Sequence, residues 1–367
     1  MRKYDPKKTS AVRHGAPSGR RQFGQLPGRW RWVSLLWVAV VGVAAVSIAD
    51  PPSREPVRLI FDTDMGNDID DALALGVIHA LQSRGECKLL AVTVTKDNQH
   101  SAPFIDAVNT FYGRGDIPIG VVRNGATPED SRYTREVANR RTGGEGSRHR
   151  YPHNLLSGRD APEAVGLLRK VLAGQPDRSV VIVQVGFSTN LARLLDSRAD
   201  EHSPLDGTEL VRRKVRLLSA MAGNFRKRHK EYNVVTDVPS AKKVFHNWPT
   251  PIVVSDFEIG RVIKYPARSI LEDYNYVANH PLAEAYTLYK KMPYDRETWD
   301  LTSVLYAVRP DRGYFGLSPA GRVAVGDEGF TDFREQPDGP HRYLLVDEEQ
   351  IIRVRETLVA LCSQPPT

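Results

Sequence analysis

The chain has 367 residues, of which 41% are hydrophobic and 8% aromatic, so it can bury a large core and is not intrinsically disordered. Its formal net charge is +7, but residues 1–32 hold nine Lys and Arg against the single acid Asp5. This leader therefore carries +8, and the remaining residues sum to −1. A body so close to neutral does not imply a nucleic-acid-binding surface.

The segment that follows the basic leader is apolar on all faces. Residues 33–49 are uncharged and stand between the leader and a proline-containing break. The segment is long for a signal-peptide core and just long enough to span a membrane. We therefore expect a signal peptide, with cleavage before Asp50, or a membrane anchor. The protein would be exported (periplasmic or extracellular) or attached to a membrane through this segment alone; a buried core helix is the less favoured reading.

After this segment, strand-like apolar runs alternate with helical patterns. In chain order we expect a strand at 57–64, a helix at 70–85, a strand at 88–95, a helix at 102–115, a strand at 117–122, a helix at 161–174, a strand at 179–186, a helix at 188–199, a strand at 213–223, a helix at 238–247, a strand at 250–256, helices at 281–292 and 299–308, a hairpin at 314–333, a strand at 342–346 and a helix at 347–361. The polar stretch 123–159 predicts an insertion or an active-site loop.

This alternation predicts an α/β fold. Continuous Val-, Ile- and Leu-rich strands separated by helices are typical of a mostly parallel, Rossmann-like central sheet flanked by helices. In such sheets, ligands bind outside the carboxyl ends of the strands. We expect a single catalytic domain over residues 57–362, preceded by the basic leader and the apolar segment.

Five aspartates lie within ten positions where the first strand runs into the first helix: Asp62, Asp64, Asp68, Asp70 and Asp71. Unpaired carboxylates this close repel one another, and a helix N-terminus offsets only about 0.3–1 kcal/mol per charge. A divalent cation such as Ca²⁺, which takes roughly six to eight oxygen ligands, would offset the repulsion. A capping aspartate beside ordinary surface acids explains Asp68 or Asp70, but not the whole set.

The stretch DTDMGNDIDDALAL resembles the N-terminal motif D-T-D-P-G-x-D-D-A-x-A of the inosine-uridine preferring nucleoside hydrolases. It departs from that motif by two extra residues between Gly66 and the paired aspartates, and by Met65 in place of proline. Four further segments are similar to family motifs in the same order: 94–98, 183–195, 222–245 and 298–308. The ordered set, spanning roughly Arg58 to Val308, carries the resemblance.

The resemblance implies Ca²⁺-dependent hydrolysis of the N-ribosidic bond of ribonucleosides to ribose and free base. It implies that Asp64, Asp71, Asp300 and the main-chain carbonyl of Val185 bind Ca²⁺, and that Asp64 is also the general base. The residues that it places on the substrate are Asp70, Asn98, Asn224, Glu231, Asn233 and Trp299.

The sequence does not single out the group that assists the leaving base. Many family members have a histidine just before the final calcium aspartate, whereas this chain has Trp299, as the purine-preferring branch does. We therefore expect Trp299 to stack on a purine base, although a tryptophan that only packs the helix start fits as well. His153, His229 or His280 could supply an acid from a loop, and His79 is expected to be structural.

Two other functions stay open. The missing histidine and the longer metal loop are compatible with a calcium-dependent nucleoside- or ribosyl-binding protein that lacks turnover. The run LIFDTD also resembles the nucleophile motif of haloacid-dehalogenase-type phosphatases. The expected partner is a nucleoside or ribosyl small molecule, not nucleic acid, and the basic segment 225–233 predicts a solvated loop more than a phosphate site. A homo-oligomer, and pairing of Cys87 with Cys362, are left open.

Overall fold

The computed structural model of the chain describes residues 55–143 and 146–367. The predicted leader at 1–32 and the apolar segment at 33–49 lie outside the described residues. Within the described ranges, no helix combines the length and the apolar character needed to cross a membrane.

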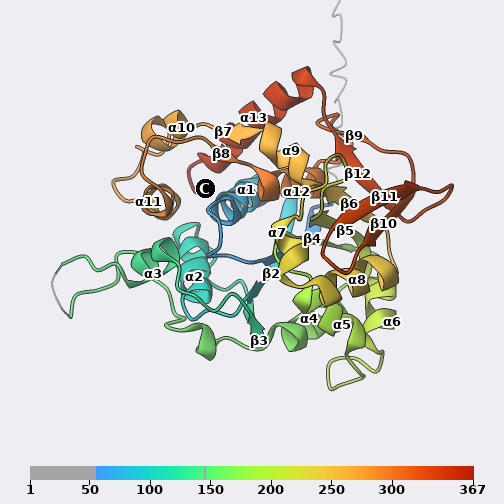
Figure 1. Ribbon diagram of the computed structural model, residues 1–367. Helices are drawn as coiled ribbons and strands as arrows, with labels where there is room; N and C mark the ends of the chain where they lie inside the picture. Colours follow the sequence, from blue (N-terminus) through green and yellow to red (C-terminus); the bar gives the residue numbers. More distant parts are fainter. Residues whose placement is uncertain (1–54, 144–145) are drawn as a thin grey trace, which may run out of the picture. The chain divides into compact units, whose positions relative to one another are not determined.

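A ten-stranded sheet lies at the centre of the described residues (Figure 1). Its parallel part runs in the order β12-β6-β5-β4-β1-β2-β3. The bounds of these strands are β1 Val57–Thr63, β2 Cys87–Lys96, β3 Ile119–Ala126, β4 Val180–Gln184, β5 Val215–Met221, β6 Ile252–Ser255 and β12 His341–Leu345. An antiparallel edge adds β9 Gly316–Leu317, β10 Gly321–Val325 and β11 Thr331–Glu335.

The central strands are apolar throughout because both faces of the sheet are covered. In β4, Val181 and Val183 contribute to one core, while Val180 and Ile182 contribute to the other, since successive side chains of a strand point to opposite faces. Helices that cover the first face are α1 Asp70–Ser83, α2 Ser101–Phe111, α11 Pro281–Tyr289, α12 Trp299–Val308 and α13 Glu348–Cys362. Helices that cover the second are α4 Ala164–Ala173, α5 Thr189–Asp196, α6 Gly207–Lys214 and α8 Val238–Asn247 (Figure 1).

The mostly parallel sheet with flanking helices confirms the predicted fold class. The region predicted as an insertion, 123–159, contains the end of β3 and a helix, α3 Arg132–Asn139, that buries Tyr133 and Val137. Short helices were also not predicted, because they offer too few residues for a periodic pattern; these are α7 Tyr232–Thr236, α9 Phe257–Val262 and α10 Ala267–Glu272. A separate two-stranded pair comprises β7 Lys264–Tyr265 and β8 Arg296–Glu297. Cys87 and Cys362 are both buried free thiols.

The carboxyl ends of the parallel strands bring distant segments together. Asp64 follows β1, Val185 follows β4 and Phe257 follows β6. Because these strands are parallel and adjacent through β5, their ends meet at one edge of the sheet. The candidate site is built at that edge.

Candidate active site

The turn after β1 determines where the acidic residues lie. Gly66 has a φ of +114°, which L side chains rarely adopt, and a Cβ atom there would lie 3.2 Å from Lys96 Cδ. Asp70 and Asp71 then form the first turn of α1, whose N-cap residue Ile69 provides no side-chain acceptor. The two carboxylates therefore lie next to the free N–H groups at the positive end of the helix.

Asp300, in the first turn of α12, lies close to this pair although it comes late in the chain. One carboxylate oxygen each from Asp70, Asp71 and Asp300 lies within 4.8 Å of the other two, and all three residues are buried. Burial, with a further contribution from the neighbouring carboxylates, raises the pKa of each of them well above its ordinary value. Three converging acids in a desolvated place are unstable as bare charges.

The donor set of this acid trio fits a hard divalent cation. Thr63 Oγ1 donates to Asp71 Oδ1, whereas Asp71 Oδ2 is buried and has no hydrogen-bond partner among the described residues. Carboxylate oxygens are the ligands that Ca²⁺ prefers, and a bound cation is the largest local charge in such a site. Asp70, Asp71 and Asp300 could therefore hold a metal ion.

Asp64 and Val185 lie on the same cavity but outside the trio. Asp64 Oδ2 accepts a hydrogen bond of 2.8 Å from Asn67 Nδ2, and burial raises the pKa of Asp64 to about 6. The Val185 carbonyl accepts a hydrogen bond of 2.7 Å from Asn233 Nδ2. The family resemblance predicts that Asp64 binds the metal and that Asp70 binds the substrate. The tight trio contains Asp70, which begins α1 beyond the longer loop, whereas Asp64 directly follows β1. The role of Asp64 as a metal ligand stays a prediction.

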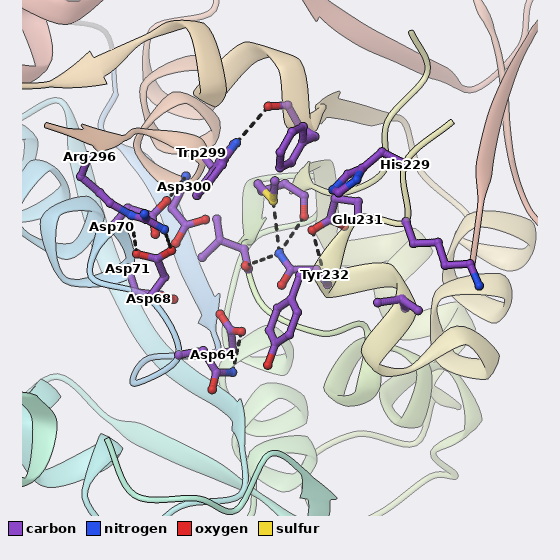
Figure 2. Close-up of a pocket in the computed structure, with 17 residues that line it drawn as sticks. Asp64, Asp68, Asp70, Asp71, His229, Glu231, Tyr232, Arg296, Trp299 and Asp300 are labelled. Atoms are coloured by element: carbon purple, nitrogen blue, oxygen red, sulfur yellow. Dashed lines mark hydrogen bonds and ion pairs between the residues drawn. The ribbon is translucent and has the colours of Figure 1, made fainter. Parts of the chain in front are cut away.

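The cavity has a volume of about 550 Å³ and presents most of the predicted site residues (Figure 2). The predicted residues that line it are Asp64, Asp70, Asp71, Val185, Glu231, Asn233, Trp299 and Asp300. His229, one of the three histidines considered as an acid, also lines it, and the lining residues that were not predicted include Asn67, Asp68, Met221, Tyr232, Phe257 and Arg296. The position of Phe257 just after β6, and that of Tyr232 between two predicted residues, could have indicated these two; no sequence signal marked Arg296.

Glu231 is held by the backbone around it. Its carboxylate accepts hydrogen bonds from the N–H groups of Asn233 at 2.8 Å, Val234 at 3.1 Å and Gly223 at 3.0 Å, so that it caps α7. Burial nevertheless raises the pKa of Glu231 to about 7. The side chain is therefore fixed at the cavity wall in one orientation.

An aromatic wall adjoins the acid trio. Trp299 Nε1 donates to the carbonyl oxygen of Phe257 at 2.9 Å, and the two rings stack with their centres 5.4 Å apart. The guanidinium carbon of Arg296 lies 5.1 Å from the centre of the Trp299 ring. On the other side of Phe257, the His229 ring lies 4.5 Å away, so that aromatic surface extends from Trp299 to His229 (Figure 2).

Two predicted substrate residues lie outside this cavity. The Asn98 amide donates at 3.1 Å to the carbonyl oxygens of Pro128 and Glu129, and so it is used to hold that loop. Asn224 Oδ1 accepts from the backbone N–H groups of Arg226 and Lys227, and closes a turn. Neither Asn98 nor Asn224 is among the residues that line this cavity, although Asn224 Nδ2 is buried and has no hydrogen-bond partner among the described residues.

The three candidate histidines also lie in different surroundings. His229 lines the cavity. His153 instead pairs with His149 at 3.1 Å, and His280 is buried among aromatic rings that include Tyr274 and Phe111. His79, as expected, is a buried structural residue, with its Nε2 2.9 Å from Asn109 Oδ1.

A cavity with converging acids at the carboxyl ends of a parallel sheet defines an α/β protein whose ligand site lies at the strand ends. The family model described as inosine-uridine preferring nucleoside hydrolase matches residues 59–348. The chain belongs to this family and is an N-glycosyl hydrolase. The haloacid-dehalogenase-type reading is thereby set aside. No curated protein matches the sequence.

Solved structures of nucleoside hydrolases share the fold. The inosine-uridine preferring nucleoside hydrolase from Bacillus anthracis superposes with a TM-score of 0.63 at 15% identity, covering 83% of this chain and 99% of that one. A plant nucleoside hydrolase superposes with a TM-score of 0.59 at 20% identity, covering 84% of this chain and 100% of that one. The purine-preferring ribonucleoside hydrolase from Gardnerella vaginalis superposes with a TM-score of 0.61 at 15% identity, covering 83% of this chain and 98% of that one. At such identities the likeness shows the fold alone.

Proposed function

We propose that this protein hydrolyses the N-ribosidic bond of ribonucleosides, with a preference for purines, and that it depends on Ca²⁺. The observation that carries the proposal is the buried trio of Asp70, Asp71 and Asp300, with an unpartnered oxygen on Asp71, beside the aromatic wall of one cavity. A binding protein without turnover would need the same residues, so it remains the alternative to be tested.

The acid residues would act together on the sugar and on water. Asp70, Asp71 and Asp300, with Asp64 and the Val185 carbonyl, would hold the Ca²⁺ ion. A bound Ca²⁺ ion would lower the pKa of a water molecule and orient the ribose. Asp64, as general base, would accept the proton of the attacking water. Cleavage of an N-riboside passes through an oxocarbenium-like state, whose positive charge the nearby carboxylates would stabilise.

The remaining cavity residues suit the sugar and the base. Asp70, Glu231 and Asn233 would contact ribose hydroxyls and so orient the anomeric carbon. Trp299, with Phe257 stacked on it, offers an aromatic surface for the base, which supports the purine preference. The name of the Gardnerella protein, purine-preferring ribonucleoside hydrolase, agrees with this direction.

Of the three candidate histidines, His229 is the one that lines the cavity. Its imidazole lies on the cavity at the outer end of the aromatic wall, and a histidine near neutral pH can donate a proton to a leaving nitrogen. We propose it as the general acid in place of the histidine that many family members carry at the position of Trp299.

The N-terminal part of the chain adds a proposal on location. The catalytic domain would span residues 57–362, and the protein would be exported or membrane-anchored through residues 33–49. Fractionation of cells that express the full chain would test this. A protein found only in the cytoplasm would contradict it.

Incubation of the full chain with inosine, adenosine and uridine in the presence of Ca²⁺, with chromatography of the free base, tests the reaction. We expect release of hypoxanthine and adenine faster than of uracil. Tight nucleoside binding without any released base would support the binding protein instead.

A further inference from the structure

In the loop after β1, the side-chain amide of Asn67 lies between the ammonium group of Lys96 and the carboxylate of Asp64. Asn67 Nδ2 donates to Asp64 Oδ2 at 2.8 Å, which is the dashed line at Asp64 in Figure 2. On its other side, Asn67 Oδ1 accepts from Lys96 Nζ at 2.9 Å. An ammonium group can only donate and a carboxylate can only accept, so these two neighbours leave one orientation for the Asn67 amide.

Lys96 is not placed as a surface lysine would be. Its side chain is 3% exposed at the end of β2, and its second hydrogen bond goes to the carbonyl oxygen of Thr127 at 2.6 Å. The nearest carboxylate with which it forms an ion pair is Glu129, at 4.0 Å and largely exposed. Burying an ammonium group without a close ion pair is costly. The position of Lys96 therefore has its clearest explanation in the group that it orients, Asn67.

The contact with Asn67 restricts the orientation of the Asp64 carboxylate. With Oδ2 held by Asn67, the carboxylate cannot rotate freely, and Oδ1 remains the oxygen that is free of this contact. Asn67 also belongs to the stretch between Gly66 and Asp70 that is two residues longer than the family motif. Asn67 itself directly follows Gly66, at the position that the motif leaves open to any residue.

We propose that Asn67 is a positioning residue for Asp64, and that Lys96 fixes the Asn67 amide in the orientation that allows this. The proposal rests on the proposed role of Asp64. Structural filling is the competing explanation, since Lys96 Cδ also packs against Gly66. Filling alone would change stability, whereas positioning would change the turnover step with little effect on substrate binding.

The test compares Asn67→Ala, Lys96→Met and Lys96→Arg with the wild-type full chain. Lys214→Met is the matched control, because Lys214 Nζ also donates to a backbone carbonyl, that of Gln175 at 2.7 Å, but on a part of the chain away from the cavity. For each protein, kcat and KM on inosine, Ca²⁺ affinity, thermal midpoint and the crystal structure around Asp64 would be determined.

We expect Asn67→Ala and Lys96→Met to lower kcat at least tenfold with KM within twofold. We also expect Asp64 to adopt another rotamer in both crystal structures. Lys96→Arg should retain most of the activity, since a guanidinium group also only donates, and Lys214→Met should change the thermal midpoint alone.

Wild-type kcat in both variants with an unmoved Asp64 would overturn the proposal, as would a fall in thermal midpoint with no change in kcat. If the wild-type protein releases no base at all, the proposed function fails instead. The rotamer of Asp64 and the Ca²⁺ affinity of the variants then decide the positioning role separately.

Discussion

The backbone N–H of Asp300 donates to Asp70 Oδ2 at 3.2 Å, which joins the first turn of α12 to the first turn of α1 across 230 residues of sequence. This contact brings an acid from late in the chain to the pair that follows β1. The metal site that we propose therefore exists only in the folded protein, and it should couple metal binding to folding.

Removing one carboxylate from the trio should abolish metal binding. We expect Asp71→Asn and Asp300→Ala each to weaken Ca²⁺ binding by more than about 100-fold, because the ion would lose a charged ligand while two buried acids remain. Isothermal titration calorimetry would measure this. Glu349→Gln is the control, since Glu349 is an exposed acid in the first turn of α13. Undiminished Ca²⁺ binding in both trio variants would show that the ligands are elsewhere.

Calcium should also stabilise the fold. An ion that binds only the native state at about 100 times its Kd adds about 2.7 kcal/mol to the free energy of unfolding. Here it would also relieve the repulsion among buried carboxylates. We expect the thermal midpoint to rise by several degrees with Ca²⁺ and to fall when a chelator is added. A midpoint that does not respond to either would argue against a calcium site in this protein.

His229→Gln should slow the reaction only where the leaving group needs a proton. We expect kcat on inosine to fall by about 100-fold, within the usual contribution of general acid catalysis. Cleavage of p-nitrophenyl riboside, whose leaving group departs as a stable anion, should stay close to the wild-type rate. Equal losses on the two substrates would assign His229 another role, and His202→Gln serves as a control away from the cavity.

Trp299→Leu should alter the preference between bases. Stacking of a base on an aromatic ring contributes about 1–3 kcal/mol, and a purine offers more ring surface than a pyrimidine. We therefore expect kcat/KM to fall about tenfold more for inosine than for uridine. A uniform loss on both nucleosides would indicate that Trp299 only packs the start of α12 against Phe257.

A buried histidine should make stability depend on pH. His280 is buried in its aromatic cluster, and burial lowers its pKa from 6.5 to about 3. Between these values the unfolded chain binds a proton that the folded chain does not, so the free energy of unfolding falls as the pH falls below 6.5, by about 1.4 kcal/mol per pH unit. Above pH 6.5 this dependence is absent.

His280→Asn should weaken that dependence. The Asn side chain can still accept from the backbone N–H of Leu282, as His280 Nδ1 does at 3.2 Å, so the cap of α11 is kept. Between pH 7.5 and pH 5, we expect the free energy of unfolding to fall by about 2 kcal/mol less in the variant than in the wild type. Chemical denaturation at the two pH values measures this. An equal fall in the free energy of unfolding in both proteins would show that His280 does not titrate as its burial implies.

Much of the fold was predictable because it depends on local patterns. The buried strands of a doubly covered sheet are continuous apolar runs, and β4 with its Val and Ile residues is an example. Short polar helices such as α3 have no such pattern. Its place is determined instead by a distant contact, in which Tyr133 OH accepts from the backbone N–H of Gly66 at 2.8 Å.

In the candidate site too, residues marked by local motifs were predictable, and residues placed by distant contacts were not. Asp64, Asp71 and Asp300 could be named because motifs mark them, and the structure places all three on one cavity. Backbone groups engage the Asn98 amide and Asn224 Oδ1, whereas Asn224 Nδ2 is buried without a partner among the described residues, and the sequence could not distinguish these two environments. Arg296 was not predicted because its ion pair with Asp68, from the longer loop, joins positions 228 residues apart.

The central claim is that metal held by the acid trio and cleavage of the nucleoside go together. The most direct measurement is to remove metal from the full chain with a chelator, add Ca²⁺ back in steps, and follow bound Ca²⁺ and hypoxanthine release from inosine in the same samples. We predict no release without Ca²⁺, and a rate that rises in proportion to one bound ion per chain. Full activity in the metal-free protein, or bound Ca²⁺ with no release from any nucleoside, would contradict the account.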